Sequence, residues 1–169
     1  AWIRPTGDGT STLDGIIVNS EGAYEIARFA DGTIRYAFAN TAPGWAWVNT
    51  GYVAELDTWT HVACAWSPQG LTVYVDGVAE ASDTTVQGVL DNNNGLHTLG
   101  AREKSGVLSQ FFLGELDEVE LAGECADGVE VRAGAVAVMF RNLIADGCGG
   151  PGALESLGAN VTSRPTCAR

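Results

Sequence analysis

The chain has 169 residues, of which 21 are acidic and 9 are basic, and its formal net charge is −12. This length suits one domain with a hydrophobic core. The excess of carboxylates argues against a nucleic-acid partner, because an acidic surface repels phosphate. The sequence contains no apolar run of about 18 residues, so it does not predict insertion into a membrane.

Short β-strand patterns begin at the first residue. Strands are expected at residues 1–5, where a proline ends the run, and at residues 15–18. Apolar and polar residues alternate at 24–29 and again at 33–38, which predicts a hairpin. Its turn would be Asp31-Gly32, with both turn residues at positive φ.

A β-meander follows in the middle of the chain. A separate strand is expected before it at residues 45–48. The meander's strands are expected at residues 59–66 and 71–77, with a Ser-Pro-Gln-Gly turn between them and a further turn at Asp76-Gly77. A short strand is expected at 96–100 after an asparagine-rich loop. Many short strands at regular spacing favour a sandwich or jelly roll over alternating strands and helices.

The last clear strand pattern, residues 111–121, changes phase midway. Phe112 and Leu116 occupy even positions, whereas Val119 occupies an odd position. A one-residue bulge near Asp117-Glu118 would place both halves on the same buried face.

After this strand the pattern changes to helical spacing. Apolar residues over 131–145 predict one C-terminal helix that stops at Asp146-Gly147. Residues 149–169 contain glycine and proline, are weakly patterned and are interpreted as a tail.

Four segments resemble signatures of laminin-G-like, or concanavalin-A-like, jelly-roll domains: A-W-I-R-P at 1–5, W-T-H-V-A at 59–63, L-T-V-Y-V-D-G at 71–77 and F-L-G-E-L-D-E-V at 112–119. The resemblance implies an all-β, two-sheet antiparallel jelly-roll sandwich over residues 1–148, with one C-terminal helix. In this family an earlier segment normally supplies a first strand, which is expected to be missing here. We hypothesise that the tail at 149–169, or a neighbouring copy, fills its place.

Aromatic and basic residues around the Pro43-Gly44 turn form a candidate sugar platform, because aromatic faces stack on sugar rings and arginines donate hydrogen bonds. The candidate ligand-binding residues are Tyr36, Trp45, Trp47, Tyr52, Arg28 and Arg35. Alternating tryptophans in a sandwich are more often core, so burial of Trp45 and Trp47 together is the stronger expectation. Trp59 and Trp66 are also expected in the core.

The resemblance further implies a calcium site, since sandwiches of this class often bind one Ca²⁺ at a sheet edge through an aspartate of the last motif strand. That ligand would be Asp117. Asp8 and Asp14 lie in a suitable loop but match no EF-hand spacing. The alternative is that Asp117 only accepts backbone hydrogen bonds at the bulge.

Glu115, Asp117 and Glu120 form an E-x-D-x-x-E pattern similar to that of family-16 glycoside hydrolases, where the two glutamates act as nucleophile and general acid. Three features argue against catalysis. A charged residue follows Asp117, few residues remain afterwards to build a cleft, and D-E-V fits the non-catalytic laminin-G pattern better. The sequence therefore predicts that the protein is not an enzyme.

Four cysteines occupy positions 64, 125, 148 and 167, without a C-x-x-C pair. Cys64 lies in an apolar strand and is interpreted as a small buried hydrophobe. A disulfide between Cys125 and Cys148 would close the C-terminal segment, whereas one between Cys148 and Cys167 would fix the tail. The sequence alone does not choose between them.

These features predict a non-catalytic recognition module, extracellular or at the cell surface, with a glycan or an extracellular protein as its partner. The main alternative is a structural or adhesive subunit that self-associates by strand or tail exchange. A family-16-like glycoside hydrolase comes third. The fold alone does not decide, because it hosts all three functions.

Overall fold

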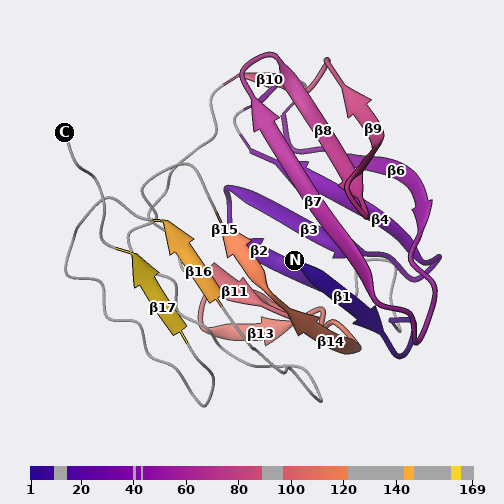
Figure 1. Ribbon diagram of the computed structural model, residues 1–169. Helices are drawn as coiled ribbons and strands as arrows, with labels where there is room; N and C mark the ends of the chain where they lie inside the picture. Colours follow the sequence, from indigo (N-terminus) through magenta and orange to yellow (C-terminus); the bar gives the residue numbers. More distant parts are fainter. Residues whose placement is uncertain are drawn as a thin grey trace.

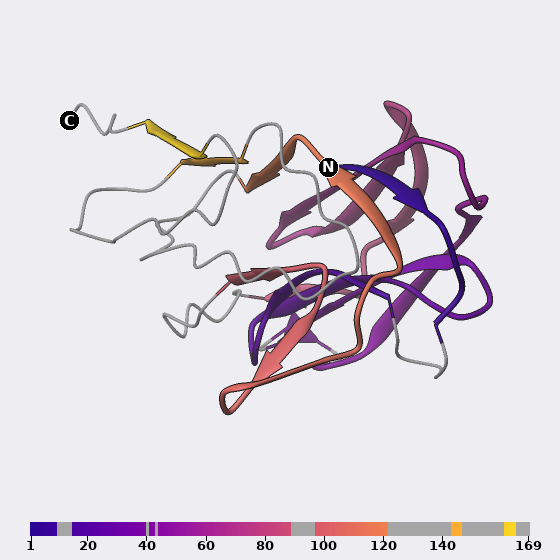
Figure 2. The same ribbon diagram turned by 90° about the horizontal axis from the view of Figure 1, so that it is seen from below.

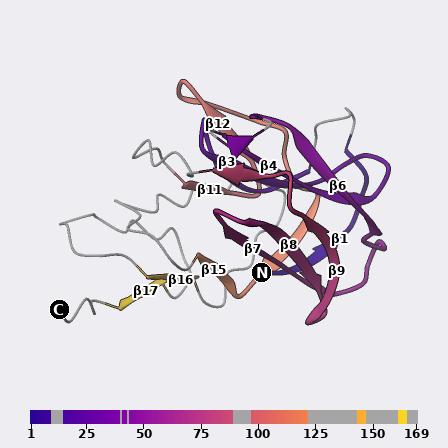
Figure 3. The same ribbon diagram turned by 90° about the horizontal axis from the view of Figure 1, so that it is seen from above.

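The computed structural model describes residues 1–9, 15–39, 41–42, 44–88, 97–121, 143–146 and 161–164. Over these residues all regular elements are strands, and most of them build two five-stranded antiparallel sheets (Figure 1). The two sheets stack as layers, as seen from below in Figure 2 and from above in Figure 3. The predicted all-β, two-sheet jelly-roll sandwich is confirmed. Among the described residues, no helix is long and apolar enough to cross a membrane.

The first sheet has the strand order β14-β1-β7-β8-β9. Its strands are β1 (Trp2–Pro5), β7 (Thr60–Ser67), β8 (Gly70–Val75), β9 (Val78–Asp83) and β14 (Gly114–Asp117). Ile3 in β1 lies opposite both Thr60 in β7 and Leu116 in β14, so β1 joins segments that are distant in sequence. The predicted turn at Asp76-Gly77 links β8 to β9, with both residues at positive φ (49° and 80°).

The second sheet has the strand order β11-β2-β3-β4-β6. Its strands are β2 (Ile16–Ser20), β3 (Tyr24–Arg28), β4 (Thr33–Phe38), β6 (Trp47–Val53) and β11 (His97–Leu99). One line of register partners crosses the sheet and contains Thr98, Asn19, Glu25, Ala37 and Trp47. These side chains share the outer face of the sheet, because the alternate residues pack inward against the first sheet.

The turn between β3 and β4 differs in detail from the prediction. Gly32 has positive φ (82°), but Asp31 does not. Phe29 N–H donates to Thr33 O (2.9 Å), and Oδ1 of Asp31 accepts the Thr33 N–H (2.9 Å). The loop therefore has three residues and ends in a left-handed glycine, which is another common hairpin geometry.

Several short strands lie outside the two main sheets. β5 (Thr41–Ala42) pairs with β10 (Gln87–Gly88), and β12 (Arg102–Lys104) forms a hairpin with β13 (Val107–Ser109). The β12–β13 hairpin lies on the outer side of the second sheet (Figure 3). A third, parallel sheet contains β15 (Val119–Leu121), β16 (Leu143–Asp146) and β17 (Val161–Arg164).

The helix and the tail predicted at the C-terminus lie only partly within the described residues. Most of the helix predicted over 131–145 lies outside the described residues, but residues 143–145 belong to β16, so the prediction is wrong there. The predicted tail contains β17, which pairs with β16 in the parallel sheet. In the described part of the chain, the tail adds no strand to either five-stranded sheet.

The main hydrophobic core lies between the two sheets. Its fully buried side chains include Ile3, Ile17, Ile34, Leu71 and Leu99. A smaller apolar cluster, formed by Ile16, Ala27, Phe29 and part of Trp47, lies on the outer face of the second sheet.

The predicted change of phase occurs at Glu118, as a break between two strands. This residue has positive φ (46°) and separates β14 from β15. Phe112, Leu116 and Val119 are all buried in the core. The break at Glu118 therefore lets the apolar residues before and after it face the same core.

Gly15 shows how closely the backbone segments approach at the start of β2. Its φ is 98°, and an added Cβ would lie 2.0 Å from the carbonyl oxygen of Arg28. The same two residues are joined by a hydrogen bond from Arg28 N–H to Gly15 O (2.9 Å). A side chain at this position would therefore meet both backbone strain and a steric clash.

Candidate functional site

The pleat of the second sheet divides the six predicted ligand-binding residues between its two faces. Tyr36 is fully buried in the main core, and this burial raises the pKa of its hydroxyl. Tyr52 is half-buried and packs against the same core. The prediction is therefore corrected for Tyr36, because a fully buried ring cannot be part of an exposed platform.

Arg28 also lies on the inner side, at one end of the sandwich, and its side chain is 5% exposed. Its Nε donates to the backbone oxygen of Ala54 (2.9 Å), and its Nη1 donates to Oδ1 of Asp8 (2.7 Å). These bonds connect β3 to the segment after β6 and to the N-terminal loop. The structure thus places Arg28 in a structural ion pair and away from the other candidates.

Trp45, Trp47 and Arg35 come together on the outer face of the second sheet. The ring centroids of Phe29 and Trp47 are 5.0 Å apart, and those of Trp45 and Trp47 are 6.2 Å apart, both in edge-to-face geometry. The guanidinium carbon of Arg35 lies 4.2 Å from the centroid of Phe29. Edge-to-face and cation–π contacts of this kind hold the rings in fixed positions.

The tryptophans differ in exposure from what the sequence predicts. Trp45 is 44% exposed whereas Trp47 is half-buried, so the two are not buried together. Trp59 is 40% exposed and lies immediately before β7 of the first sheet, so its predicted core position is wrong. Trp66 packs against the main core.

Arg35 is held by its own hairpin. Its Nη2 lies 2.5 Å from Oδ2 of Asp31, and its Nε donates to the hydroxyl of Thr33 (2.9 Å). Hydrogen bonds from Thr33, together with Arg35, keep the pKa of Asp31 below its usual value. The positive charge of Arg35 is therefore already balanced.

A cavity of about 310 Å³ lies beside Trp47, at the side of the sandwich where edge strands β6 and β9 approach each other. We call it the Trp47 cleft. Its lining residues are Phe38, Gly44, Ala46, Trp47, Val48, Asn49, Asp83, Thr85 and Val86. The volume is at the lower end of the range for small-molecule sites, about 300–1,000 Å³.

The lining of the Trp47 cleft combines an aromatic wall with a few polar groups. Asn49, Asp83 and Thr85 supply side-chain donors and acceptors, and Trp47 supplies an indole ring. Oδ1 of Asp83 accepts the backbone N–H of Thr85 (2.7 Å) and its hydroxyl (2.5 Å). These bonds lower the pKa of Asp83, so its carboxylate is ionised at neutral pH.

Sequence reasoning missed Asp83 and Thr85 as candidate site residues. Asp83 ends β9 and Thr85 follows it, whereas Trp47 and Asn49 lie on β6, and only the stacking of the two sheets brings the pairs together. The sequence signal that was present, an aspartate two residues before a threonine, is typical of a local turn and carries no information about a ligand.

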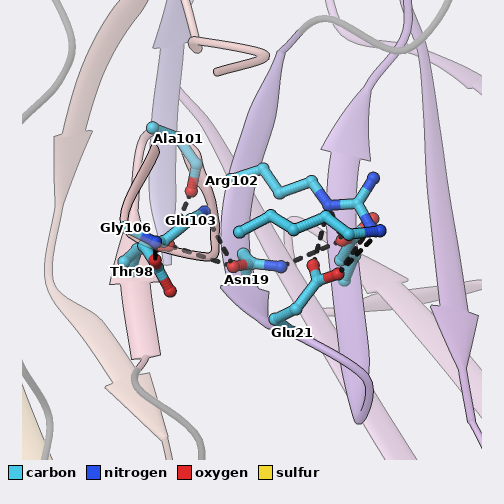
Figure 4. Close-up of polar contacts among 9 residues, drawn as sticks. Asn19, Glu21, Thr98, Ala101, Arg102, Glu103 and Gly106 are labelled. Atoms are coloured by element: carbon cyan, nitrogen blue, oxygen red, sulfur yellow. Dashed lines mark hydrogen bonds and ion pairs between the residues drawn. The ribbon is translucent and has the colours of Figure 1, made fainter. Parts of the chain in front are cut away.

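A polar network occupies the other half of the same outer face, beneath the β12–β13 hairpin (Figure 4). Arg102 Nε lies 2.7 Å from Oε2 of Glu21 and 3.2 Å from Oε1 of Glu25. Asn19 Nδ2 donates to Oε1 of Glu25 (2.9 Å), and Asn19 Oδ1 accepts the Glu103 N–H (3.1 Å). The network therefore attaches the hairpin to the sheet.

The two glutamates of this network have opposite electrostatic environments. Burial raises the pKa of Glu25, which is 2% exposed. Hydrogen bonds from Arg102 lower the pKa of Glu21, which is more accessible. Since Asn19 and Glu25 are buried and satisfied by each other, the network is structural.

The first sheet carries two residues of the E-x-D-x-x-E pattern, Glu115 and Asp117, both in β14. Glu115 forms an ion pair with Arg4 (2.6 Å), and the guanidinium of Arg4 lies 5.8 Å from the ring centroid of Trp59. The hydrogen bond from Arg4 lowers the pKa of Glu115. Glu120 is exposed and belongs to β15, beyond the break at Glu118.

Asp117 accepts a local backbone hydrogen bond, since its Oδ1 accepts the backbone N–H of Glu118 (2.9 Å). This contact is the alternative that the sequence left open. Among the described residues, no group of three or more His, Cys, Asp or Glu side chains could hold a metal ion. Calcium at Asp117 stays a prediction.

Cys64 is a free cysteine that packs against the main core, and burial raises the pKa of its thiol. Cys125, Cys148 and Cys167 lie outside the described residues, so both predicted disulfides stay predictions.

Comparison with known proteins adds a family match. Residues 1–132 match the model of a family described as the concanavalin A-like lectin/glucanases superfamily. A native heptameric SAP-like pentraxin from Limulus polyphemus is a similar solved structure, with 17% sequence identity and a TM-score of 0.42. That match covers 67% of this chain and 57% of the pentraxin chain, less than two thirds of the latter. None of the curated proteins is significantly similar to the chain.

Proposed function

Because the chain belongs to the concanavalin A-like lectin/glucanases superfamily, we propose that it is a non-catalytic, extracellular carbohydrate-recognition module whose sugar site is the Trp47 cleft. The observation that carries this proposal is the position of Trp47, with Trp45 packed edge-to-face against it, at a cavity lined by three polar side chains. Aromatic rings stack on the apolar faces of sugars, and convergent polar groups bind the hydroxyls.

The geometry of the aromatic pair supports this proposal. Trp45 offers an indole that is 44% exposed, and Trp47 is fixed from behind by Phe29. Such preorganisation limits the side-chain entropy that a ligand must overcome on binding. Asn49 and Thr85, both exposed, supply donors and acceptors on opposite sides of the cleft.

The same cleft supports a binding rather than a hydrolytic role. Glycoside hydrolysis commonly uses a pair of carboxyl groups that flank the scissile bond. Asp83 is the one carboxylate among the described residues that line the Trp47 cleft. Glu115 lies on the other sheet, bound to Arg4, so it does not supply the second group there.

The test is a glycan array followed by titration calorimetry on the best ligand. We expect Trp45→Ala to weaken binding about tenfold or more, since truncating an aromatic contact at a binding site commonly costs that much. Trp59→Ala is the matched control, because Trp59 is similarly exposed, 40% against 44%, but lies beside the first sheet, against Arg4 of β1.

Equal losses for both variants, or a loss with Trp59→Ala alone, would contradict the placement of the site. Hydrolysis of the bound glycan by the unmodified protein would contradict the non-catalytic part of the proposal.

A further inference from the structure

The described residues that line the Trp47 cleft carry negative charge without a balancing positive charge. Asp83 is the one ionisable residue among the described residues that line it, and Thr85 keeps it ionised. Both bonds from Thr85 go to Oδ1. A carboxylate has about four acceptor positions, so Asp83 retains capacity to accept hydrogen bonds from ligand hydroxyls.

The cations that could balance an acidic ligand are already used. Wherever the structure describes an arginine or lysine side chain, that side chain is in an ion pair with a carboxylate: Arg4–Glu115, Arg28–Asp8, Arg35–Asp31, Arg102–Glu21 and Lys104–Glu21. Arg35 is the arginine closest to the cleft by strand register, because it lies opposite Asn49.

Arg35 is unsuited to leave its partner for a ligand. Its guanidinium is fixed on three sides, by Asp31 (2.5 Å), by the hydroxyl of Thr33 (2.9 Å) and by the ring of Phe29 (4.2 Å). Moving it to an acidic sugar would leave Asp31 unpaired, in a chain whose net charge is already −12.

We propose that the Trp47 cleft selects an uncharged sugar and rejects acidic glycans, and that Asp83 is the residue that sets this specificity. The carboxylate of Asp83 accepts hydrogen bonds from sugar hydroxyls, and it repels a uronate, sialate or sulfate at the same position. This selectivity rests on the sugar site proposed above. It specifies the class of sugar that binds there and the residue that discriminates against acidic sugars.

The experiment uses pairs of ligands that differ in one group. Neutral glucose, mannose and galactose oligosaccharides are compared with their C6-oxidised uronate counterparts, in which each CH₂OH becomes a carboxylate. We expect the intact protein at pH 7 and low salt to bind a neutral oligosaccharide about tenfold or more tightly than its uronate, because like charges placed together carry a large penalty.

Two variants assign this preference to Asp83. In Asp83→Asn the side-chain oxygen still accepts the Thr85 bonds, so the turn is kept while the charge is removed, and we expect the ratio of neutral to acidic affinity to fall toward one. Glu80→Gln is the matched control, because it removes an equal, exposed charge from the same strand β9 outside the cleft. We expect it to leave the ratio unchanged.

Two results overturn the selectivity while leaving the sugar site in place. One is uronate binding as tight as neutral binding and sensitive to Trp45→Ala. The other is an Asp83→Asn variant that is folded by circular dichroism and keeps the full ratio. If no oligosaccharide of either class binds, or if binding is insensitive to Trp45→Ala, the sugar site itself is wrong and the selectivity is rejected with it.

Discussion

Arg28 and Arg35 were both predicted as hydrogen-bond donors to a ligand, and the structure gives each of them a carboxylate partner instead. The partner of Arg35 is four residues away, within its own hairpin. The partners of Arg28, Asp8 and Ala54, are 20 and 26 residues away. The sequence identifies residue types suited to binding, but it does not show which of them are already engaged across the fold.

The close backbone approach at Gly15 leads to a prediction at the same scale. We expect Gly15→Ala to lower the free energy of unfolding by about 3 kcal/mol or more, because strained φ and a clash with Arg28 O act together. Urea denaturation monitored by tryptophan fluorescence measures this change.

Gly77→Ala provides the matched control for Gly15→Ala. Gly77 also has positive φ (80°), but nothing lies within 4 Å of an added Cβ. We expect a smaller cost of about 1 kcal/mol, from backbone strain alone. Equal costs at both glycines would show that the close approach to Arg28 does not contribute.

At the scale of elements, alternation of apolar and polar residues predicted the strands well. The hairpin of β3 and β4, the meander of β7 to β9 and the change of phase at Glu118 all follow from local pattern. The pattern failed at residues 143–145, which form β16 although their spacing suits a helix. Pairing with β15, 24 residues earlier, is a tertiary contact that periodicity does not encode.

The candidate site was also predicted only in part. Periodicity along a strand indicates which face a residue lies on, but it does not encode tertiary contacts. Trp45, Trp47 and Arg35 do lie on one face, as alternation along the strands implies. Tyr36 faces the opposite way, because it is offset by one residue from Arg35 and Ala37. Asp83 comes from the other sheet, so its place in the cleft depends on how the two layers stack.

The polar network beneath the β12–β13 hairpin predicts that ionisation of Glu25 destabilises the fold, whereas ionisation of Glu21 stabilises it. Glu25 has a pKa above the usual 4.5, so its ionisation destabilises the fold increasingly as pH rises through and above that value. Glu21 has a pKa below 4.5, so its contribution is present at neutral pH and is lost as pH falls through its lowered pKa.

At pH 7 we therefore expect Glu25→Gln to raise the free energy of unfolding. The side-chain oxygen of Gln can still accept the hydrogen bond from Asn19, and Arg102 still has its ion pair with Glu21. We expect Glu21→Gln to lower the free energy of unfolding by about 1 kcal/mol, the scale of a partly exposed ion pair. Urea denaturation at pH 7 and at pH 3 measures both, and the two differences should shrink at pH 3. Effects of the same sign at pH 7 would contradict the assignment.

At the scale of the whole molecule, the parallel β15–β16–β17 sheet is separate from the five-stranded sheets in the described residues. We expect residues 1–148 to fold without residues 149–169, because β17 pairs only with β16 there. Near-ultraviolet circular dichroism of the shortened chain should match that of the full chain, and its glycan binding should be kept.

Light scattering of both chains, with calcium and with chelator, tests the alternative of self-association. If the full chain assembles and the shortened chain does not, the tail is the joining element. If the shortened chain is unfolded or aggregated, residues 149–169 cover part of the sandwich and the expectation above is wrong.

A calcium-dependent rise in melting temperature that Asp117→Asn abolishes would support the predicted calcium ligand.

The edge-to-face pair of Trp45 and Trp47 also makes the proposed site visible to spectroscopy. Two indoles whose centroids are 6.2 Å apart, with ring planes at 82°, have electronic transitions that couple and give a paired positive and negative band in circular dichroism. A sugar seated on Trp45 would change the polarisability around one chromophore of the pair. Binding at the cleft should therefore perturb this couplet without any label, whereas a ligand held on the opposite sheet should leave it unaltered.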